Sequence, residues 1–190
     1  MKNPSSTREA QLLETASSFC QALLENPPPP PSALIRQFFV SSNPVPRGSK
    51  QLLNNHNPSP PRITEHGPEW ARSRLPFLAK TFTGVLECLE YFTLLSKTLK
   101  MHMGKDTFPS IESGGFVVDA EARVEREDED EDESMLGAVS VVGKARFESV
   151  KTGKDWEEQF IYRFSGFDKE GKIGHWEIWA DPLSAWVACE

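Results

Sequence analysis

The chain has few cysteines and no long hydrophobic run. Its 190 residues include three cysteines, Cys20, Cys88 and Cys189, an odd number that contains no CxxC pair. This pattern argues against a disulfide framework and predicts small buried thiols. No apolar stretch reaches the roughly 18 residues that a membrane-spanning helix needs, and the polar N-terminus does not resemble a signal peptide. We therefore predict one domain over residues 1–190, cytoplasmic and without membrane contact.

Several motifs of known enzyme classes are also missing. The sequence has no Walker motif, no GxGxxG and no GxSxG, so nucleotide binding and serine hydrolysis lack support. Metal binding requires ligands that converge, but no HxH or HxxxH spacing occurs. The histidines are scattered: His56, His66, His102 and His175. The sequence predicts neither a metal nor a cofactor.

The acidic charge is concentrated in one place. Between residues 125 and 134 there are eight carboxylates and one arginine, so this segment carries the whole net charge of −7. The remainder is neutral, which gives no bulk attraction to nucleic acid. Seven consecutive carboxylates repel one another, so 125–134 is predicted to be a disordered hairpin insertion. Calcium binding and docking of a basic partner are the weaker alternatives.

The N-terminal half contains helical patterns. Ser6 with Glu9 is typical of a capping box, and apolar residues then recur at helical spacing. This helix is expected to end by Asn26, because the prolines at 27–31 remove five successive backbone donors. Ser32 is a suitable cap for a short second helix.

The segments that follow are more varied. Residues 41–61 are rich in Asn, Pro and Ser and predict a flexible loop, either a lid over a pocket or an insertion without a role. Residues 62–66 predict a short strand, and 70–80 a helical piece interrupted at Pro76. The stripe of apolar residues over 82–99 predicts an amphipathic helix that packs on a sheet.

From residue 115 the hydrophobic period changes to two. Alternating apolar and polar residues predict strands over 116–124, 139–148 and 160–164, and a closing strand over 173–179. Helices followed by long antiparallel strands indicate the α+β class, with the N-terminal helices packed on one face of a strongly curved, mainly antiparallel sheet.

Several of these stretches resemble one known family. Residues 63–68, Leu75-Pro76-Phe77, Gly84, Tyr91-Phe92 and 171–177 are similar to the SnoaL-like branch of the NTF2-like superfamily, and more narrowly to fungal proteins of that type. The resemblance runs from about residue 7 to the end, apart from the 41–61 loop and the acidic insertion. It implies a cone-shaped fold with a cavity at the open end. Its relatives include polyketide cyclases, ketosteroid isomerases and dehydratases, together with transport adaptors and domains without catalytic activity.

In cyclases and isomerases of this type, a cavity acid or base moves a proton next to a carbonyl, and a hydrogen-bond donor stabilises the enolate. Ketosteroid isomerases carry an Asp base just before a proline in the first strand. Here the position holds His66 or, with a one-residue shift, Glu65. Histidine suits a base at neutral pH. A structural role for His66 at the strand end is the other interpretation.

The closing strand offers two more candidates, His175 and Glu177. If His175, Glu177 and Trp179 face the cavity, Glu177 would transfer a proton and His175 would tune it. The opposite orientation puts Trp176 and Ile178 inside and turns the ionisable pair toward solvent or a dimer partner. Strand alternation alone does not decide between the two.

Four aromatic residues are candidates for binding a hydrophobic substrate: Tyr91, Tyr162, Trp179 and Trp70. The tyrosines would donate hydrogen bonds to a substrate oxygen, although tyrosines on apolar stripes are commonly core residues. The first functional hypothesis is a cofactor-free cyclase, isomerase or dehydratase that acts on a hydrophobic small molecule. The alternative is a non-catalytic module that binds a ligand or forms a homodimer through the sheet face, using Trp156, Trp176 and Trp186.

Overall fold

The computed structural model describes residues 4–41, 59–123 and 136–190. The predicted acidic insertion and most of the predicted 41–61 loop lie outside these ranges. The helices are α1 (Pro4–Leu23), α2 (Pro31–Phe38), α3 (Gly84–Thr98) and α4 (Pro182–Ala188), with short 3-10 turns η1 (Glu69–Ser73) and η2 (Ile111–Ser113). The strands are β1 (Arg62–His66), β2 (Lys80–Thr83), β3 (Leu99–His102), β4 (Phe116–Asp119), β5 (Ala138–Ser149), β6 (Asp155–Ser165) and β7 (His175–Trp179).

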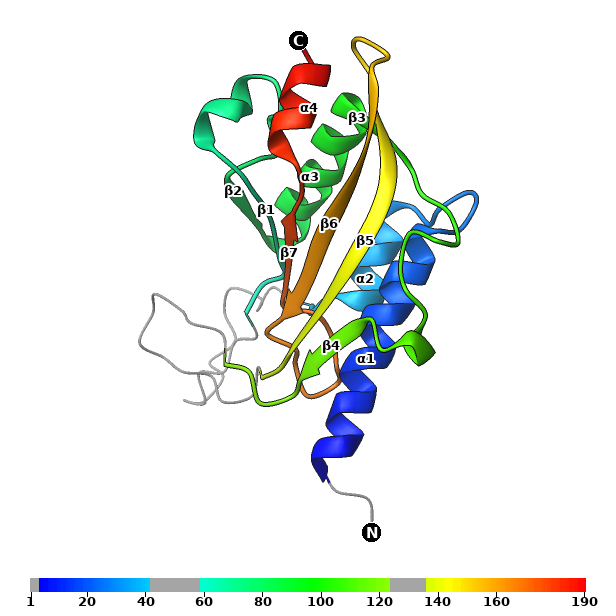
Figure 1. The fold of residues 1–190 in the computed structure, drawn as a ribbon. Helices are drawn as coiled ribbons and strands as arrows, with labels where there is room; N and C mark the ends of the chain where they lie inside the picture. Colours follow the sequence, from blue (N-terminus) through cyan, green and yellow to red (C-terminus); the bar gives the residue numbers. More distant parts are fainter. Residues whose placement is uncertain (1–3, 42–58, 124–135) are drawn as a thin grey trace, which may run out of the picture.

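The seven strands form one mixed sheet. Its order is β2-β1-β7-β6-β5-β3, and β4 also pairs with β5. Every pair is antiparallel except β1 with β7, which run parallel. Helices α1, α2 and α3 lie behind the sheet in Figure 1, so the view looks onto the outer face of the strands. The predicted α+β architecture, with helices on one face of a mainly antiparallel sheet, is confirmed.

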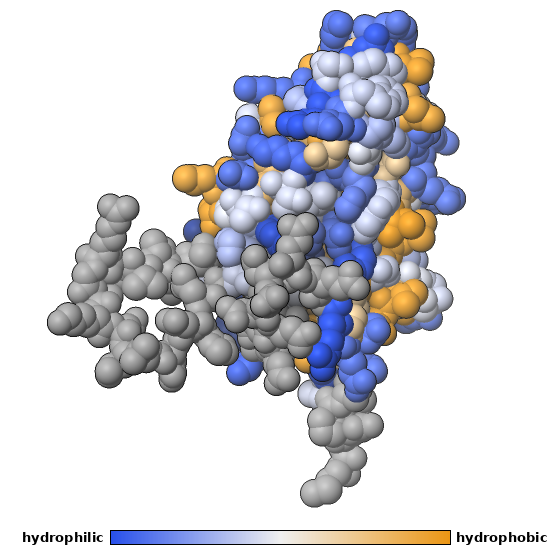
Figure 2. All heavy atoms as spheres, turned by 90° about the vertical axis from the view of Figure 1, so that its left-hand side faces the viewer, coloured by the Kyte–Doolittle hydropathy of each residue, from blue (hydrophilic) through white to orange (hydrophobic). Residues whose placement is uncertain are grey.

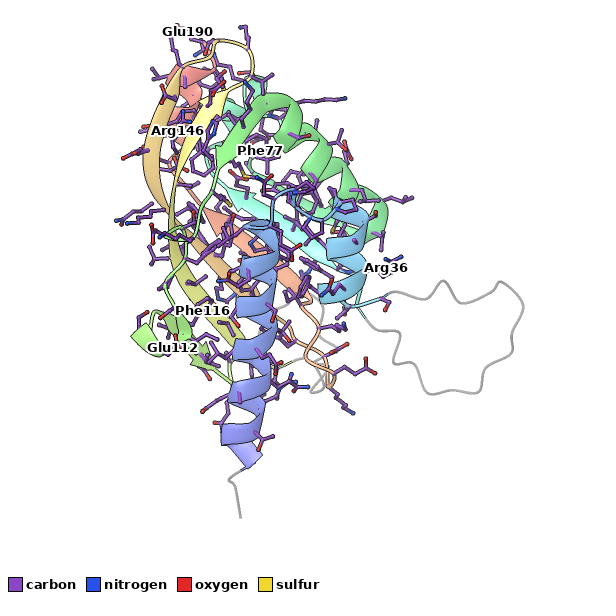
Figure 3. The ribbon with its side chains drawn as sticks, turned by 90° about the vertical axis from the view of Figure 1, so that its right-hand side faces the viewer. Arg36, Phe77, Glu112, Phe116, Arg146 and Glu190 are labelled. Atoms are coloured by element: carbon purple, nitrogen blue, oxygen red, sulfur yellow. The ribbon has the colours of Figure 1, made fainter. Side chains whose placement is uncertain are left out.

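The core lies between α1 and the inner face of the sheet. The edge-on view in Figure 3 shows α1 running lengthwise along the sheet, with α2 beside it. Phe19 of α1 is fully buried, and four aromatic rings surround it with centroids 5.0 to 5.7 Å away: Phe38, Phe39, Phe164 and Trp176. All four contacts are edge-to-face, the favourable arrangement for aromatic quadrupoles.

The three cysteines are buried and unpaired, as the sequence predicted. Burial raises the pKa of Cys88 to about 12, and it also raises the pKa of Cys20. Thiols of this kind are inert packing residues.

Helix α3 packs on the core through part of the predicted stripe, since Leu95 is buried and Leu89 and Phe92 pack against the core. Its buried residues are Cys88, Tyr91 and Leu95, whereas Leu86, a member of the predicted stripe, is 83 % exposed. The buried face is rotated from the centre of the stripe toward Cys88 and Tyr91, and away from Leu86. Tyr91 is inside because its hydroxyl has a polar partner in the core, described below.

The C-terminal helix α4 was not predicted and lies at the upper end of the molecule in Figure 1, close to η1. The carboxylate of Asp181 caps it by accepting hydrogen bonds from the amides of Leu183 and Ser184. Arg74 holds it from the side, with its guanidinium 4.0 Å from the Trp186 ring centre and a 3.0 Å hydrogen bond to the Trp186 carbonyl. Short length and a single capping residue explain why the sequence pattern missed α4.

Within the described ranges, no helix is both long and apolar enough to cross a membrane.

Candidate functional site

A narrow cavity lies between α3, the inner face of the sheet and α4. Its walls are mostly apolar and aromatic, and its polar groups come from strands β1 and β6, helix α3 and the start of α4. The free volume is about 40 Å³, which holds a few water molecules. Sites for drug-sized ligands usually measure several hundred Å³. A larger ligand therefore enters only if lining side chains move.

Glu65 is the buried ionisable group of this cavity. It is 7 % exposed, and its Oε2 accepts a 2.7 Å hydrogen bond from the Tyr91 hydroxyl. Burial raises the pKa of Glu65 to about 7, helped by the negative charge of Glu158 and opposed by the hydrogen bond from Tyr91. The carboxyl group is thus poised to gain or lose a proton near neutral pH.

Two further donors lie in the cavity wall beside Glu65. Trp176 is 2 % exposed, and its buried Nε1 has no hydrogen-bond partner among the residues that the structure describes. The ring of Tyr162 lies 4.9 Å from that of Trp176, and Tyr162 also lines the cavity. Burial and neighbouring acids hold the pKa of Tyr162 well above its usual range, so it stays a donor. A buried donor without a partner in a cavity wall, such as the Trp176 indole, is suited to bind an oxygen atom of a ligand.

A second carboxyl group lies nearer to α4. Glu158 points inward from β6 and accepts a 2.7 Å hydrogen bond from the indole of Trp156. Partial burial raises the pKa of Glu158, with the charge of Asp181 acting in the same direction. Asp181 also borders the cavity, and its hydrogen bonds to Ser184 and Leu183 lower its pKa.

The closing strand adopts the second of the two orientations considered from the sequence. Trp176 and Ile178 face inward and line the cavity, whereas His175, Glu177 and Trp179 lie on the outer face. The orientation that would turn these three side chains into the cavity is therefore wrong. The physical reason is the aromatic cluster around Phe19, which buries Trp176 and so fixes the alternation of β7.

On the outer face, the three residues predicted to be catalytic do come together. His66 Nε2 lies 3.2 Å from Glu177 Oε1, and the His66 ring stacks on Trp179 at 4.1 Å. Arg163 donates a hydrogen bond to the other Glu177 oxygen at 2.5 Å. His175 Nε2 lies 2.8 Å from the Thr64 hydroxyl, and burial lowers the pKa of His175 to about 4. Each of these polar groups has a partner within the sheet, as in a structural network.

The other predicted residues divide between the cavity and the surface. Tyr91 and Tyr162 line the cavity. His66 also borders it, but its ring contacts Glu177 and Trp179 on the outer face of the sheet. Trp179 lies outside, and Trp70 is 55 % exposed and packs edge-on against Trp186 of α4. Whether any of these residues takes part in catalysis stays a prediction.

The sequence reasoning missed one ionisable residue of the cavity, Glu158, and favoured a neighbour of another, Glu65. Glu158 was not considered, although it shares the inward face of β6 with Phe160 and Tyr162 at a spacing of two. Trp176 was considered as an inward-facing residue in one of the two orientations of the closing strand, and as a dimer residue, but not as a hydrogen-bond donor. Glu65 was the alternative to His66, and the structure places it, not His66, with its side chain inside.

No group of three metal-ligating side chains occurs in the ranges 4–41, 59–123 and 136–190.

Solved structures with the same architecture span almost the whole chain. An NTF2-like protein from Burkholderia xenovorans LB400 superposes with a TM-score of 0.56 over 96 % of this chain and 98 % of that protein, at 11 % identity. The chain has an NTF2-like fold.

Two further structures agree with this fold. A candidate isomerase from Bacillus subtilis gives a TM-score of 0.54 at 13 % identity, covering 95 % of this chain and 94 % of its own. A candidate SnoaL-like polyketide cyclase from Jannaschia sp. CCS1 gives a TM-score of 0.51 at 12 % identity, over 100 % of this chain and 96 % of that protein. No family model and no curated sequence matches the chain. At such identities, the NTF2-like likeness defines the fold and leaves the activity open.

Proposed function

We propose that this NTF2-like chain catalyses a cofactor-free proton transfer on a small hydrophobic carbonyl compound, as an isomerase, cyclase or dehydratase does. The observation that carries the proposal is Glu65: a buried carboxyl group in an apolar cavity whose pKa is raised to about 7. General acid–base catalysts work best when their pKa lies near the working pH. Cavity carboxylates with raised pKa values are candidates for this role.

The residues of the cavity suit the steps of such a reaction. Ionised Glu65 removes a proton from the carbon next to the carbonyl group, and the electron pair of that C–H bond moves to the oxygen. The Tyr162 hydroxyl and the Trp176 indole N–H lie in the same wall and would donate to the developing oxyanion. The Tyr91 hydroxyl orients the carboxylate. Protonated Glu65 then returns the proton to the substrate, so no cofactor is needed.

Exchange of α-protons tests this function without knowledge of the natural substrate. Small ketones such as acetone and cyclopentanone require the least movement of the lining side chains, and NMR in D₂O follows the loss of their α-proton signals. We expect the protein to accelerate exchange, with a rate that rises as the pH passes about 7, because only ionised Glu65 accepts a proton. Glu65→Gln should lower the enzymatic rate at least ~100-fold, the lower end of the range for a general base.

The same assay separates the cavity from the outer network. Glu177→Gln removes the carboxylate that His66 and Arg163 contact, without touching the cavity wall. If exchange depends on Glu177 and is unaffected by Glu65→Gln, the catalytic roles first predicted for His66, His175 and Glu177 are right and the cavity mechanism is wrong. Exchange that never exceeds the buffer rate would also count against the mechanism.

A non-catalytic role as a homodimerisation module is the second candidate, and the outer sheet face favours it. Val142, Ile161 and Trp179 are neighbours across three strands and are 51, 43 and 38 % exposed. Figure 2 shows hydrophobic residues gathered along its right-hand edge, which is the side of the molecule that faces the viewer in Figure 1. Of the tryptophans first considered for this surface, Trp176 is excluded because it is buried.

Sedimentation measurements test the dimer. Ile161 lies at the centre of the exposed row, so Ile161→Lys places a charge where two copies would meet. We expect the protein to sediment as a dimer and the variant to dissociate at least ~10-fold more readily, because an unpaired charge in an apolar interface is costly. A wild-type protein that is monomeric at all concentrations tested would contradict this role.

A further inference from the structure

Helix α4 and the residues just before it close one end of the cavity. Ala180, Asp181, Pro182 and Ala185 belong to the lining, together with residues of α3 and of the inner face of the sheet. With α4 in this position (Figure 1) the free volume is about 40 Å³. This space holds a few water molecules and is too small even for cyclopentanone. Part of the wall therefore has to move before an organic molecule enters.

Of the elements that form the wall, α4 is held least by buried apolar groups. Helix α3 and the sheet contribute whole buried rings, such as Tyr91 and Trp176. The buried residues of α4 are Ala185 and Ala188, whereas its larger Leu183 is 61 % exposed. Hydrophobic stabilisation grows with the apolar area removed from water, and two methyl groups remove little. Helix α4 is therefore the part of the wall that separates from the core most readily.

Polar contacts near the surface hold the far end of α4 in place. The guanidinium of Arg74 lies over the Trp186 ring, donates a hydrogen bond to the Trp186 carbonyl and lies 3.6 Å from the Glu190 carboxylate. The hydroxyl of Thr152, in the turn between β5 and β6, donates a 2.5 Å hydrogen bond to the Ala188 carbonyl. We call these contacts of Arg74 and Thr152 the latch. Water can replace contacts of this kind, so the latch is reversible.

The near end of α4 has the features of a hinge. Strand β7 ends at Trp179 and α4 begins at Pro182, so Ala180 and Asp181 form a short connection. The backbone amide of Asp181 donates a hydrogen bond to the Glu158 carboxylate, and its side chain caps the helix. Both contacts stay in place when the far end of α4 swings outward. Hinges are commonly a few residues at the end of an element that absorb the change in backbone angles.

We propose that α4 is a gate, hinged at Ala180 and Asp181 and held shut by the Arg74 latch, whose outward movement admits substrates to the cavity. This inference rests on the proposed function, because it concerns access to the same cavity. The shut state excludes organic ligands by size, and the open state binds them. A ligand that binds only the open state is bound more tightly when that state is more populated, in proportion to its fraction.

Cys189 reports the open state without any engineered label. It directly follows α4 and is 5 % exposed, so iodoacetamide reaches its thiol when the end of the helix moves away. Cys20 of α1 and Cys88 of α3 are fully buried and report unfolding of the rest of the protein. Peptide mass spectrometry measures the three alkylation rates separately. We expect Cys189 to react at least ~10-fold faster than the other two thiols in the wild type.

Releasing the latch should change alkylation and ligand affinity by the same factor. We expect Arg74→Ala to raise the alkylation rate of Cys189 at least ~10-fold, with the other two thiols unchanged. Calorimetric titration with cyclopentanone should show an affinity higher by about this factor, because both quantities scale with the open fraction. Thr152→Val should act in the same direction, and it applies the same test if Arg74→Ala does not fold. The matched control is Arg72→Ala, which removes an ion pair with Glu69 on η1 and should change neither quantity.

Each result decides the matter. Unchanged alkylation of Cys189 in Arg74→Ala overturns the gate, as does faster alkylation without a gain in affinity, which would show fraying of the C-terminus apart from the cavity. Equal acceleration at all three cysteines overturns it too, because it would show global destabilisation. If Glu65→Gln abolishes ketone exchange although Arg74→Ala changes neither quantity, the proposed function stands without the gate. If rate and affinity rise together while ketone exchange is absent, the gate stands and the proposed catalysis fails.

Discussion

Glu65→Gln is expected to remove a large part of the pH dependence of stability. The folded protein holds the pKa of Glu65 at about 7, against an ordinary value of 4.5. Between these two values the folded state binds more protons than the unfolded state, so the free energy of unfolding falls as the pH rises. The loss attributable to Glu65 is about 3 kcal/mol, since each pKa unit corresponds to about 1.4 kcal/mol. It is absent below about pH 4.5 and complete above about pH 7.

Urea unfolding at a series of pH values measures this effect as a difference between proteins. Relative to the wild type, Glu65→Gln should gain stability as the pH rises from about 4.5 to 7 and should gain no more above that range. Glutamine keeps an acceptor for the Tyr91 hydroxyl and nearly the same volume. The exposed Glu157→Gln serves as a control and should run parallel to the wild type. Parallel curves for Glu65→Gln as well would mean that Glu65 is ionised in the folded protein.

Phe19→Ala is expected to cost the most stability of any single truncation discussed. The ring is fully buried and contacts Phe38, Phe39, Phe164 and Trp176 edge-to-face. Phenylalanine-to-alanine changes in cores cost about 3–5 kcal/mol, from lost burial and from the cavity left behind. These four rings belong to α2 and its C-terminal end and to strands β6 and β7, so the loss should affect the whole molecule.

Chemical denaturation measures this loss, and Leu86→Ala is the matched control. Leu86 is 83 % exposed on α3, so its truncation should change stability by less than about 0.5 kcal/mol. A loss below about 1 kcal/mol for Phe19→Ala would show that the aromatic cluster does not hold the helices to the sheet. Because Trp176 touches both Phe19 and the cavity, ketone exchange by Phe19→Ala should be impaired as well.

The sequence predicted the helices and strands that have a strong hydrophobic period or that end at a clear signal such as a proline run. The proline run ends α1 as expected, and strand β1 begins and ends at the predicted residues. The long strands β5 and β6 follow the alternation of apolar and polar residues. Strands β2 and β3 were predicted as parts of neighbouring helices. Each has only four residues next to α3, which is too short for an alternation of apolar and polar residues to be recognised.

The site was harder to predict than the fold, because it depends on which face of a strand is inside. The segment from Glu65 to His66 contains two plausible bases, and a shift of one residue exchanges their faces. On β7 the ionisable residues attracted attention, yet Trp176 decides the orientation by packing against Phe19 and Tyr162. Pairings across the sheet, such as His66 with Glu177, join residues 111 apart and carry no local signal.

The central claim is that Glu65 keeps its proton up to near-neutral pH inside an apolar cavity. Carbon-13 NMR of the glutamate side-chain carboxyl groups, with Glu65 assigned by comparison with Glu65→Gln, measures its titration directly. The account predicts a midpoint near pH 7. A midpoint near the ordinary 4.5 would show a carboxylate that is hydrated and ionised, and it would contradict both the cavity site and the proposed proton transfer.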